Sequence, residues 1–449
     1  DTELRLDKIL KLHHKHNLQF KIFFIGNNAN INEKYPINYL GEYCKRLSGS
    51  DIIAILKERK RRTIKQVATI MFTSGSTGMP KGVSFSMYNI ITKRFARAAA
   101  LPEVGENEVL LCYLPLFHTF GRYLEMLGML FWSGTYTFCG NPSADTILKF
   151  FPIVNPTGFI SIPLRWAQIY ERIIEEEDKI KIAEHKETAY KQITGRNLRW
   201  GLSAAGYLSP DIFKFFQERG IELCSGFGMT EATGGITLTP IGKYVENSVG
   251  KPLPGINIYL DPNGELIISG HYVAHYDNEF NFDSEIKFPD EEEYMFKTGD
   301  VFKLLDDGHY EIIDRVKDIY KNNKGQTVSP RLVEQNFEGV AGVKRTFLVG
   351  DGKPYNVLFI VPDDEEPILK LYKNREEQRQ YFRQIIDVCN SSLAQYDRII
   401  NFEILDRDFS DQLEEITAKN TFNRKNIVKN FSDLIDDLYK SNTIELKYG

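Results

Sequence analysis

The chain carries the segment TIMFTSGSTGMPKGV from Thr69 to Val83, in which an apolar run leads into a loop of hydroxyl and glycine residues that closes on one lysine. The glycines lack Cβ atoms, so backbone N–H groups can converge on an anion there. The hydroxyl groups add hydrogen-bond donors, and the lysine adds a positive charge. We therefore predict a phosphate-binding loop, with contacts from Thr73, Ser74, Gly75, Ser76, Thr77, Gly78 and Lys81.

Two other interpretations of this loop are weaker. A Walker loop would need the spacing G-x-x-x-x-G-K-[ST], which the segment does not have. A run of glycine, serine and threonine is by itself more often a solvated turn or linker than a binding site. The ordered succession of ten residues from Thr73 to Gly82 argues against a linker.

The composition is that of an ordinary globular protein of 449 residues, with 42% hydrophobic and 26% charged residues. That length predicts at least two domains. The net charge of −5 gives no electrostatic argument for binding nucleic acid or an anionic membrane. The longest apolar stretch, residues 124–139, is interrupted by glycine and is too short to span a bilayer. We expect no nucleic acid partner and no transmembrane segment, while peripheral contact with a membrane stays open.

The five cysteines are scattered, and no two of them form a C-x-x-C pair. This pattern is typical of free thiols in a reducing compartment and argues against a metal cluster. No signal peptide is visible; because the chain opens on Asp1 rather than on methionine, we expect that the true N-terminus was removed or lies outside this sequence. We predict a cytoplasmic location.

One local cluster of positive charge lies between Lys57 and Lys65. Ile53, Leu56 and Ile64 are interleaved with this cluster at near-helical spacing. That spacing favours the solvated face of a helix over a binding patch.

Helix-then-strand units recur through the first two thirds of the chain, which predicts an α/β layered domain with an at least partly parallel sheet. From Asn247 the pattern changes to short strands and turns, so we expect a small β-rich subdomain at about residues 247–314. A compact α+β region follows Arg315. The predicted organisation is a large domain at residues 1–314 and a smaller, mobile C-terminal domain at residues 315–449.

The order T-S-G-S-T-G-x-P-K-G resembles the phosphate loop of the adenylate-forming superfamily, which includes acyl-CoA synthetases, luciferases and nonribosomal peptide adenylation domains. Further segments follow in the order that this family shows, so the resemblance covers nearly the whole chain. Three segments are most like long-chain fatty acyl-CoA synthetases: LPLFH at 114–118, NSVGKPLPG at 247–255 and DGHYEIIDR at 307–315. The resemblance implies an AMP-binding large domain and a small C-terminal domain.

One segment with small side chains resembles the turn that lies against adenine in this family. It comprises Ser203, Ala204, Ala205 and Gly206. Small residues suit a backbone that must approach a flat ring, but a plain turn between a strand and a helix explains this segment nearly as well.

The segment CSGFGMTE at 224–231 is more specific, because it resembles the family's Y-G-x-T-E motif. The resemblance implies that Phe227, followed by Gly228, stacks on adenine through its aromatic face. Thr230 would contact the α-phosphate. Glu231 would hold Mg²⁺, which prefers hard oxygen ligands.

The segments KTGD at 297–300 and IDRVKD at 313–318 match the family's T-G-D and R-x-K-D pair. The resemblance implies that Asp300 and Arg315 bind the ribose hydroxyls. Lys317 would be the hinge about which the small domain turns between two half-reactions. A solvent-exposed salt bridge on a linker is the alternative interpretation of these charges.

His118 lies in the segment LPLFHTFG at 114–121. The segment looks like the one whose histidine or aromatic residue lies beside the substrate carboxylate and gates its pocket in this family. Without that resemblance, a lone histidine in an apolar run is more often a core residue.

Two features depart from the family pattern. The family's C-terminal catalytic lysine lies in a P-x-x-x-x-G-K-x-x-R segment, but with Arg424 as the anchor that position holds Thr421. Lys419 comes two residues earlier and would face the same side of an extended segment, so we predict Lys419 as the catalytic lysine. The phosphate loop also begins near residue 72, which is early for the family, so we expect the N-terminal part of the family fold to be absent.

Taken with the resemblance, the sequence predicts an acid–thiol ligase that uses ATP and Mg²⁺. It would activate a carboxylic acid, by resemblance a fatty acid, as acyl-adenylate and transfer the acyl group to CoA. The catalytic residues would be Lys419, Thr230, Glu231, His118 and Lys81. Two alternatives stay open: an acyl-AMP ligase that loads an acyl carrier protein or an amine, and a truncated or degenerate paralogue that binds nucleotide or acyl chain without turnover.

Overall fold

The computed structural model describes residues 8–12, 15, 22–24, 37–39, 44–73, 81–180, 183–276, 295–416 and 421–448. The chain divides into two compact units, Asp1–Gln66 and Val67–Gly449. Within these described ranges, no helix combines the length and the apolar composition that crossing a membrane requires. All five cysteines are free thiols.

Among its described residues, the first unit contains a helical stretch at 8–12, two short strands and a longer helix. Strands β1 (Ile22–Phe24) and β2 (Ile37–Tyr39) pair in parallel. Helix α3 (Gly49–Arg61) begins at a capping box, in which Ser48 and Asp51 satisfy each other's backbone N–H groups. The predicted helix and its exposed basic residues are confirmed, but Ile53 and Leu56 are exposed as well and Ile64 lies beyond the helix end.

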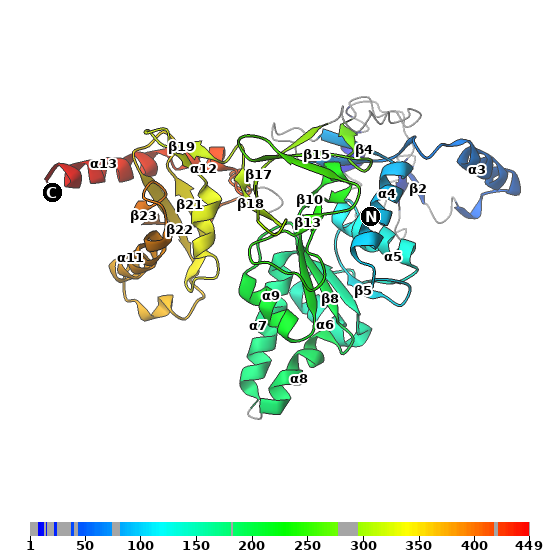
Figure 1. Ribbon diagram of the computed structural model, residues 1–449, viewed down its shortest axis with the longest axis horizontal. Coiled ribbons are helices and arrows are strands. Elements are labelled where there is room, and N and C mark those ends of the chain that lie inside the picture. Colours follow the sequence, from blue (N-terminus) through cyan, green and yellow to red (C-terminus); the bar gives the residue numbers. More distant parts are fainter. Residues whose placement is uncertain are drawn as a thin grey trace. The chain divides into compact units, whose positions relative to one another are not determined.

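The second unit is built on a five-stranded parallel sheet in the order β6-β5-β7-β8-β9, which confirms the predicted parallel α/β layer. Its strands are β5 (Val109–Cys112), β6 (Thr135–Phe138), β7 (Gly158–Ser161), β8 (Trp200–Ala204) and β9 (Glu222–Gly226). Figure 1 shows the helices gathered around this sheet: α6 (Ala144–Val154), α7 (Pro163–Lys179), α8 (Ala183–Thr194) and α9 (Pro210–Glu218). Phe159, Trp166 and Phe216 pack edge to face between strands and helices, which explains the apolar runs.

A smaller antiparallel sheet contains both ends of the predicted phosphate loop. It has the order β16-β4-β3, with β3 (Val67–Thr73), β4 (Lys81–Ser86) and β16 (His275–Tyr276). Helix α4 (Met87–Ala100) follows β4 directly from a capping box made by Ser86 and Asn89. The π-helix η1 (Phe120–Met126) and α5 (Leu127–Trp132) come next after β5.

The short strands predicted after Asn247 are present. Strands β14 (Asn257–Leu260), β15 (Glu265–Ser269), β17 (Phe296–Leu304) and β18 (Tyr310–Arg315) form a four-stranded antiparallel sheet. Several short elements precede it: the paired strands β10 (Gly228–Met229) and β11 (Gly234–Gly235), the 3-10 turn η2 (Thr230–Ala232) between them, and the paired strands β12 (Thr237–Leu238) and β13 (Lys251–Pro252).

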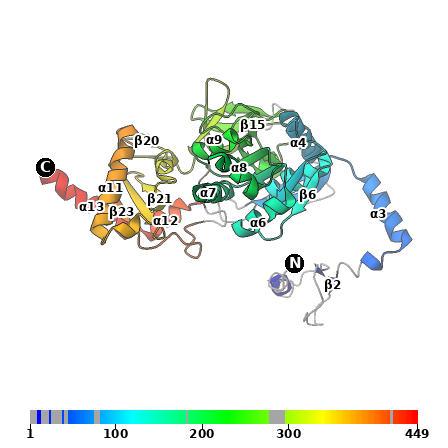
Figure 2. The same cartoon turned by 90° about the horizontal axis from the view of Figure 1, so that it is seen from below.

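The C-terminal region is an α+β layer, as predicted. Strand β22 (Asn356–Pro362) pairs antiparallel with β21 (Val343–Val349) and parallel with β23 (Ile399–Ile404). Helix α11 (Arg375–Ser392) covers one face of this sheet, and α12 (Arg424–Asn430) and α13 (Ser432–Tyr448) cover the other (Figure 2). Shorter elements precede and interrupt the sheet: β19 (Tyr320–Lys321), β20 (Thr327–Val328), α10 (Pro330–Glu334), η3 (Gln335–Phe337) and η4 (Leu369–Leu371). The domain boundary at 314/315 stays a prediction.

Candidate active site

The predicted phosphate loop connects two paired strands. Thr73, the last residue of β3, lies opposite Lys81, the first residue of β4. The Thr73 hydroxyl donates a hydrogen bond to the Lys81 carbonyl at 3.4 Å. The predicted contacts Ser74, Gly75, Ser76, Thr77 and Gly78 lie outside the described residues. Both anchors of the loop are therefore described, and its phosphate contacts remain predictions.

The structure brings Lys81 and Glu231 together through Tyr276. The Lys81 ammonium lies 5.4 Å from the centroid of the Tyr276 ring. The Tyr276 hydroxyl donates a hydrogen bond to the Glu231 carboxylate, which is buried. A cation, an aromatic hydroxyl and a buried acid thus meet beside the end of the phosphate loop.

Backbone contacts fix this arrangement. Tyr276 lies opposite Val83 in the antiparallel pairing of β16 with β4. The Glu231 carbonyl accepts a hydrogen bond of 2.6 Å from the Ala274 N–H. Tyr276 was not among the residues predicted from the sequence, because no motif around it marks it as a site residue. Only the pairing of β16 with β4 places it in the site.

The hairpin of β10 and β11 presents the aromatic, glycine, threonine and acid positions. Gly228 lies opposite Gly235, and a Cβ on Gly228 would clash with the backbone of Gly234. The ring of Phe227 is half-buried and meets Phe302 edge to face, with centroids 4.9 Å apart. Phe227 therefore belongs partly to the core beneath the antiparallel sheet, and its stacking on adenine stays a prediction.

The small-residue turn follows the carboxyl end of β8. Ala205 has a φ of +69°, a left-handed conformation that is unusual for a residue other than glycine. Ala205 and Gly206 are exposed, so their backbone is accessible. The Ser203 hydroxyl is buried and makes no hydrogen bond. A strained turn and an unsatisfied hydroxyl at a strand end are typical of a ligand site.

Asp300 and Arg315 face each other across β17 and β18. Their side chains form an ion pair, with 3.3 Å between Arg315 Nε and Asp300 Oδ1. Burial raises the pKa of Asp300, and the positive charge of Arg315 opposes that rise. The two predicted ribose ligands are therefore adjacent.

Lys317 is exposed and lies two residues after the end of β18. The preceding Asp314 is buried, and its Oδ2 accepts hydrogen bonds from the Ser329 hydroxyl and the Arg331 N–H at 2.7 and 2.9 Å. These contacts fix the chain on the N-terminal side of Lys317 to the start of α10.

His118 lies in the turn between β5 and η1. Its side chain is half-buried, and its backbone N–H donates to the Pro115 carbonyl at 3.1 Å. The neighbouring Phe117 is 70% exposed. The π-helix that follows is a rare element, often found at functional sites.

Lys419 lies outside the described residues, but both ends of its loop are anchored. Ile416 and Phe422 form an isolated bridge, and the Asn423 N–H donates to the Glu415 carbonyl at 2.8 Å. Just beyond, Arg424 forms a 2.5 Å ion pair with Glu334. The described residues on either side of the segment 417–420, which includes Lys419, are therefore held together.

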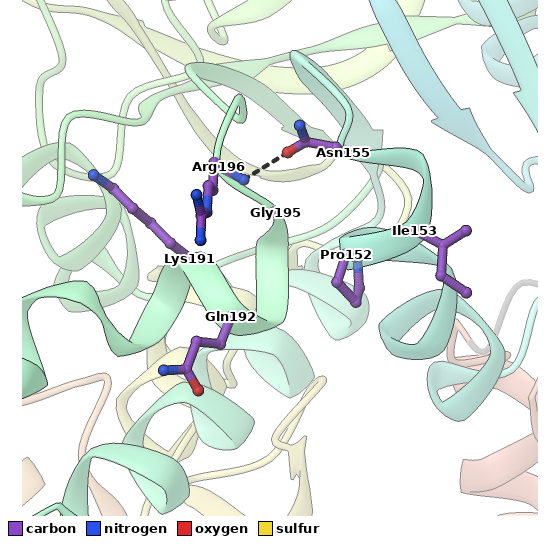
Figure 3. A pocket seen from close by; sticks show the side chains of 7 residues that line it. All are labelled: Pro152, Ile153, Asn155, Lys191, Gln192, Gly195 and Arg196. Carbon is purple, nitrogen blue, oxygen red and sulfur yellow. Dashed lines mark hydrogen bonds between the residues drawn. The ribbon is translucent and has the colours of Figure 1, made fainter.

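A pocket of about 820 Å³ lies elsewhere, between the ends of α6 and α8. Figure 3 shows Asn155 turned toward Arg196, whose backbone N–H it binds at 2.6 Å through Oδ1. No predicted site residue lines this pocket, so it is separate from the candidate active site.

Comparison with known proteins agrees with this geometry. The family model described as AMP-binding enzyme matches residues 27–275, and the AMP-binding enzyme C-terminal domain matches residues 317–443. The chain belongs to the AMP-binding, adenylate-forming enzyme family, which confirms the resemblance seen in the sequence.

Similar curated proteins include ligases for long-chain fatty acids. The long-chain-fatty-acid–CoA ligase FadD15 of Mycobacterium bovis is 24% identical over 424 residues, which cover 83% of this chain and 69% of that protein. The long-chain-fatty-acid–CoA ligase 1 of Schizosaccharomyces pombe is 26% identical over 447 residues, which cover 84% of this chain and 64% of that protein.

Solved structures share the fold. The anthranilate CoA ligase AuaEII in complex with anthranoyl-AMP has a TM-score of 0.71 at 20% identity, over 97% of this chain and 78% of that chain. The O-succinylbenzoate CoA synthetase of Bacillus subtilis with ATP and magnesium has a TM-score of 0.61 at 20% identity, over 84% of this chain and 77% of that chain. The shared fold is a large N-terminal α/β domain with a parallel sheet and a smaller C-terminal domain.

Proposed function

We propose that this protein activates a carboxylic acid, by its relatives a fatty acid, with ATP and transfers the acyl group to CoA. The observation that carries the proposal is the contact of Tyr276 with both Glu231 and Lys81. It puts a candidate metal ligand beside the lysine that ends the phosphate loop.

The residues present fit a magnesium ion. Glu231 offers a buried carboxylate, which is the hard oxygen donor that Mg²⁺ prefers. When bound, the ion would help to neutralise the charge of the triphosphate. Glu231 would hold it, and Tyr276 would fix the orientation of the carboxylate.

The first step joins the acid to the nucleotide. One substrate carboxylate oxygen attacks the α-phosphorus of ATP, the bond to the β-phosphate oxygen breaks, and pyrophosphate leaves. Lys81, Thr230 and Lys419 would stabilise the negative charge that grows on the phosphate oxygens. His118 would lie beside the carboxylate and gate its pocket.

Other residues would hold the nucleotide. Phe227 and Gly228 would lie on one side of the adenine, and the 203–206 turn would approach it with its backbone. Asp300 and Arg315 would bind the ribose hydroxyls. The adjacency of Asp300 and Arg315 and the strained turn at Ala205 support this assignment.

The second step transfers the acyl group. The thiol of CoA attacks the acyl carbon, the bond to the phosphate oxygen breaks, AMP leaves, and the thiol proton passes to solvent. An acyl-adenylate is already activated, so this step chiefly needs positioning and exclusion of water. We propose that residues 315–449 form a small mobile domain that turns about Lys317 between the two steps. The free cysteines support a cytoplasmic location.

Pyrophosphate release tests the proposal. The protein is mixed with ATP, Mg²⁺ and dodecanoate, and CoA is then added. Release that leads to acyl-CoA supports the ligase. Release without acyl-CoA would favour an acyl-AMP ligase that loads a carrier protein or an amine. The absence of release would favour a nucleotide or acyl binder, which the threonine at position 421 already suggests.

A further inference from the structure

Helix α4 buries three charged side chains beside apolar ones, while some of its large apolar side chains are exposed. Lys93, Arg94 and Arg97 are buried, with 0%, 4% and 4% of their surfaces exposed. Ile91 and Phe95 on the same helix are 38% and 62% exposed. A surface helix normally buries its apolar residues and exposes its charges. The buried cations of α4 therefore need an explanation of their own.

These three residues, here called the cation cluster, have no counter-ion in the part of the chain that the structure describes. Nε and Nη1 of both Arg94 and Arg97 are buried and make no hydrogen bond. Burial, followed by the charges of Arg97 and Arg94, lowers the pKa of Lys93 well below its ordinary value. The carboxylate of Glu125 is also buried, but it pairs with none of the three.

Protonation chemistry does not remove this charge. Arginine stays protonated in proteins, so the two guanidinium groups keep their charge. Burying an ionised group without a partner is strongly unfavourable. A carboxylate would satisfy the free donors, because its two oxygens match the fork of a guanidinium group.

The cation cluster adjoins the candidate active site. Lys93 donates a hydrogen bond to the Gly235 carbonyl, and its Nζ lies 3.9 Å from the centroid of the Tyr272 ring. The Arg97 guanidinium packs against Gly235, where a Cβ would clash with it. Gly235 pairs with Gly228, which belongs to the predicted adenine-binding segment. An anion on the cluster would thus lie next to β11, the strand that pairs with this segment.

We infer that Lys93, Arg94 and Arg97 bind the second carboxylate of a dicarboxylic acid, whose first carboxylate is the one activated with ATP. This inference rests on the proposed function and deepens it by naming the substrate class. A substrate with a purely apolar tail would leave the cluster unpaired, whereas a remote carboxylate would neutralise part of its charge.

The test compares matched acids in two assays. The acids are dodecanedioate and adipate, with dodecanoate and hexanoate as partners of equal carbon number. One assay measures the melting temperature of the protein with each acid and no ATP, which does not need turnover. The other measures kcat/KM from pyrophosphate release. The variants are Arg97→Met and Arg94→Met, with Arg172→Met on the exposed side of α7 as the matched control.

We expect a dicarboxylate to raise the melting temperature more than its partner and to have an at least tenfold higher kcat/KM. Arg97→Met should abolish both preferences and raise the melting temperature of the ligand-free protein, because it removes an unpaired buried charge. Arg94→Met should have the same two effects, and it replaces Arg97→Met in the test if that variant does not fold. Arg172→Met should change neither preference.

Three results would overturn the inference. The first is that monocarboxylates raise the melting temperature of the wild-type protein as much as the dicarboxylates do, or more, and have an equal or higher kcat/KM. The second is that both arginine variants keep the preference for dicarboxylates. The third is that both variants melt at a lower temperature than the wild-type protein when no acid is present. Should no acid release pyrophosphate, the proposed function fails. A dicarboxylate-dependent rise in melting temperature that is lost in Arg97→Met would then still support the anion site.

Discussion

At the scale of single residues, the proposed chemistry depends most directly on the Glu231 carboxylate. Its burial and its hydrogen bond from Tyr276 fix the position of one acid near Lys81, at the end of the predicted phosphate loop. A carboxylate held in this way can coordinate a metal ion without first losing conformational freedom.

Glu231→Gln should lower acyl-adenylate formation by roughly a hundredfold or more, because it removes the anionic ligand with almost no change of shape. The measurement is pyrophosphate release over a range of Mg²⁺ concentrations. Glu175→Gln, on the exposed side of α7, is the matched control and should leave the rate unchanged. Normal release from Glu231→Gln would refute the magnesium assignment.

Tyr276→Phe should keep the fold and the contact of the ring with Lys81, yet lose the hydrogen bond to Glu231. A hydrogen bond to a charged group contributes about 1.5–3 kcal/mol, so we expect a loss of roughly tenfold or more in kcat/KM. The loss should shrink at high Mg²⁺ concentration. Tyr259→Phe, at an exposed position of strand β14, serves as the control. A Mg²⁺-independent loss would instead indicate a packing role.

The pH dependence of ATP binding tests Asp300. Burial raises its pKa above the ordinary value of 3.8, so the carboxylate takes up a proton at a higher pH than an exposed aspartate does. ATP affinity should fall as pH falls through this raised pKa, because the ribose loses an acceptor. The contribution of Asp300 to the free energy of unfolding changes in the opposite direction. It rises as pH falls, since protonation removes the buried charge. Titration of ATP into Asp300→Asn should show weaker and pH-independent binding. If the variant keeps the wild-type dependence of ATP affinity on pH, Asp300 is not the ribose ligand that titrates.

At the scale of elements, the sequence predicts the parallel sheet well, because the apolar strands β5, β7 and β8 are buried between helices. It also places Asp300 and Arg315 correctly as neighbours, since the motif pair spans two strands of one antiparallel sheet. Tyr276 and the cation cluster could not be predicted. The first depends on a pairing between strands far apart in sequence, and the second buries charges that a surface helix normally exposes.

The loop that carries Lys419 is an element with fixed ends. Glu334 accepts hydrogen bonds from Arg424 and from the Leu348 N–H, which anchors the segment just after this loop. The isolated bridge between Ile416 and Phe422 closes the loop itself.

Lys419→Ala should lower acyl-adenylate formation by about two to three orders of magnitude and spare thiolysis of added acyl-AMP, because the charge is needed only while the phosphate oxygens gain charge. Lys425→Ala is the control, since Lys425 is exposed on α12. The two half-reactions are assayed separately. Normal acyl-adenylate formation by Lys419→Ala would contradict this role. So would a sharp rise of that activity in Thr421→Lys from a low wild-type rate. Either result would indicate a weakened family member that has lost its catalytic lysine.

At the scale of the whole molecule, one chain provides an AMP-binding region and a matching C-terminal region. Lys81 and Glu231 lie in the first region and meet through Tyr276, directly after its last matched residue, whereas Lys419 belongs to the sequence matched as the second region. Under the proposed mechanism, activation of the acid would require both regions at once, whereas a binding protein would need the AMP-binding region alone.

The most direct test of the central claim is acid-dependent exchange of labelled pyrophosphate into ATP. The protein is incubated with ATP, Mg²⁺, labelled pyrophosphate and dodecanedioate or dodecanoate, without CoA. Reversible acyl-adenylate formation predicts label in ATP that depends on the acid and is lost in Glu231→Gln. If ATP binds to the folded protein but no tested acid supports exchange, the protein does not form an acyl-adenylate from these acids, and the account is contradicted.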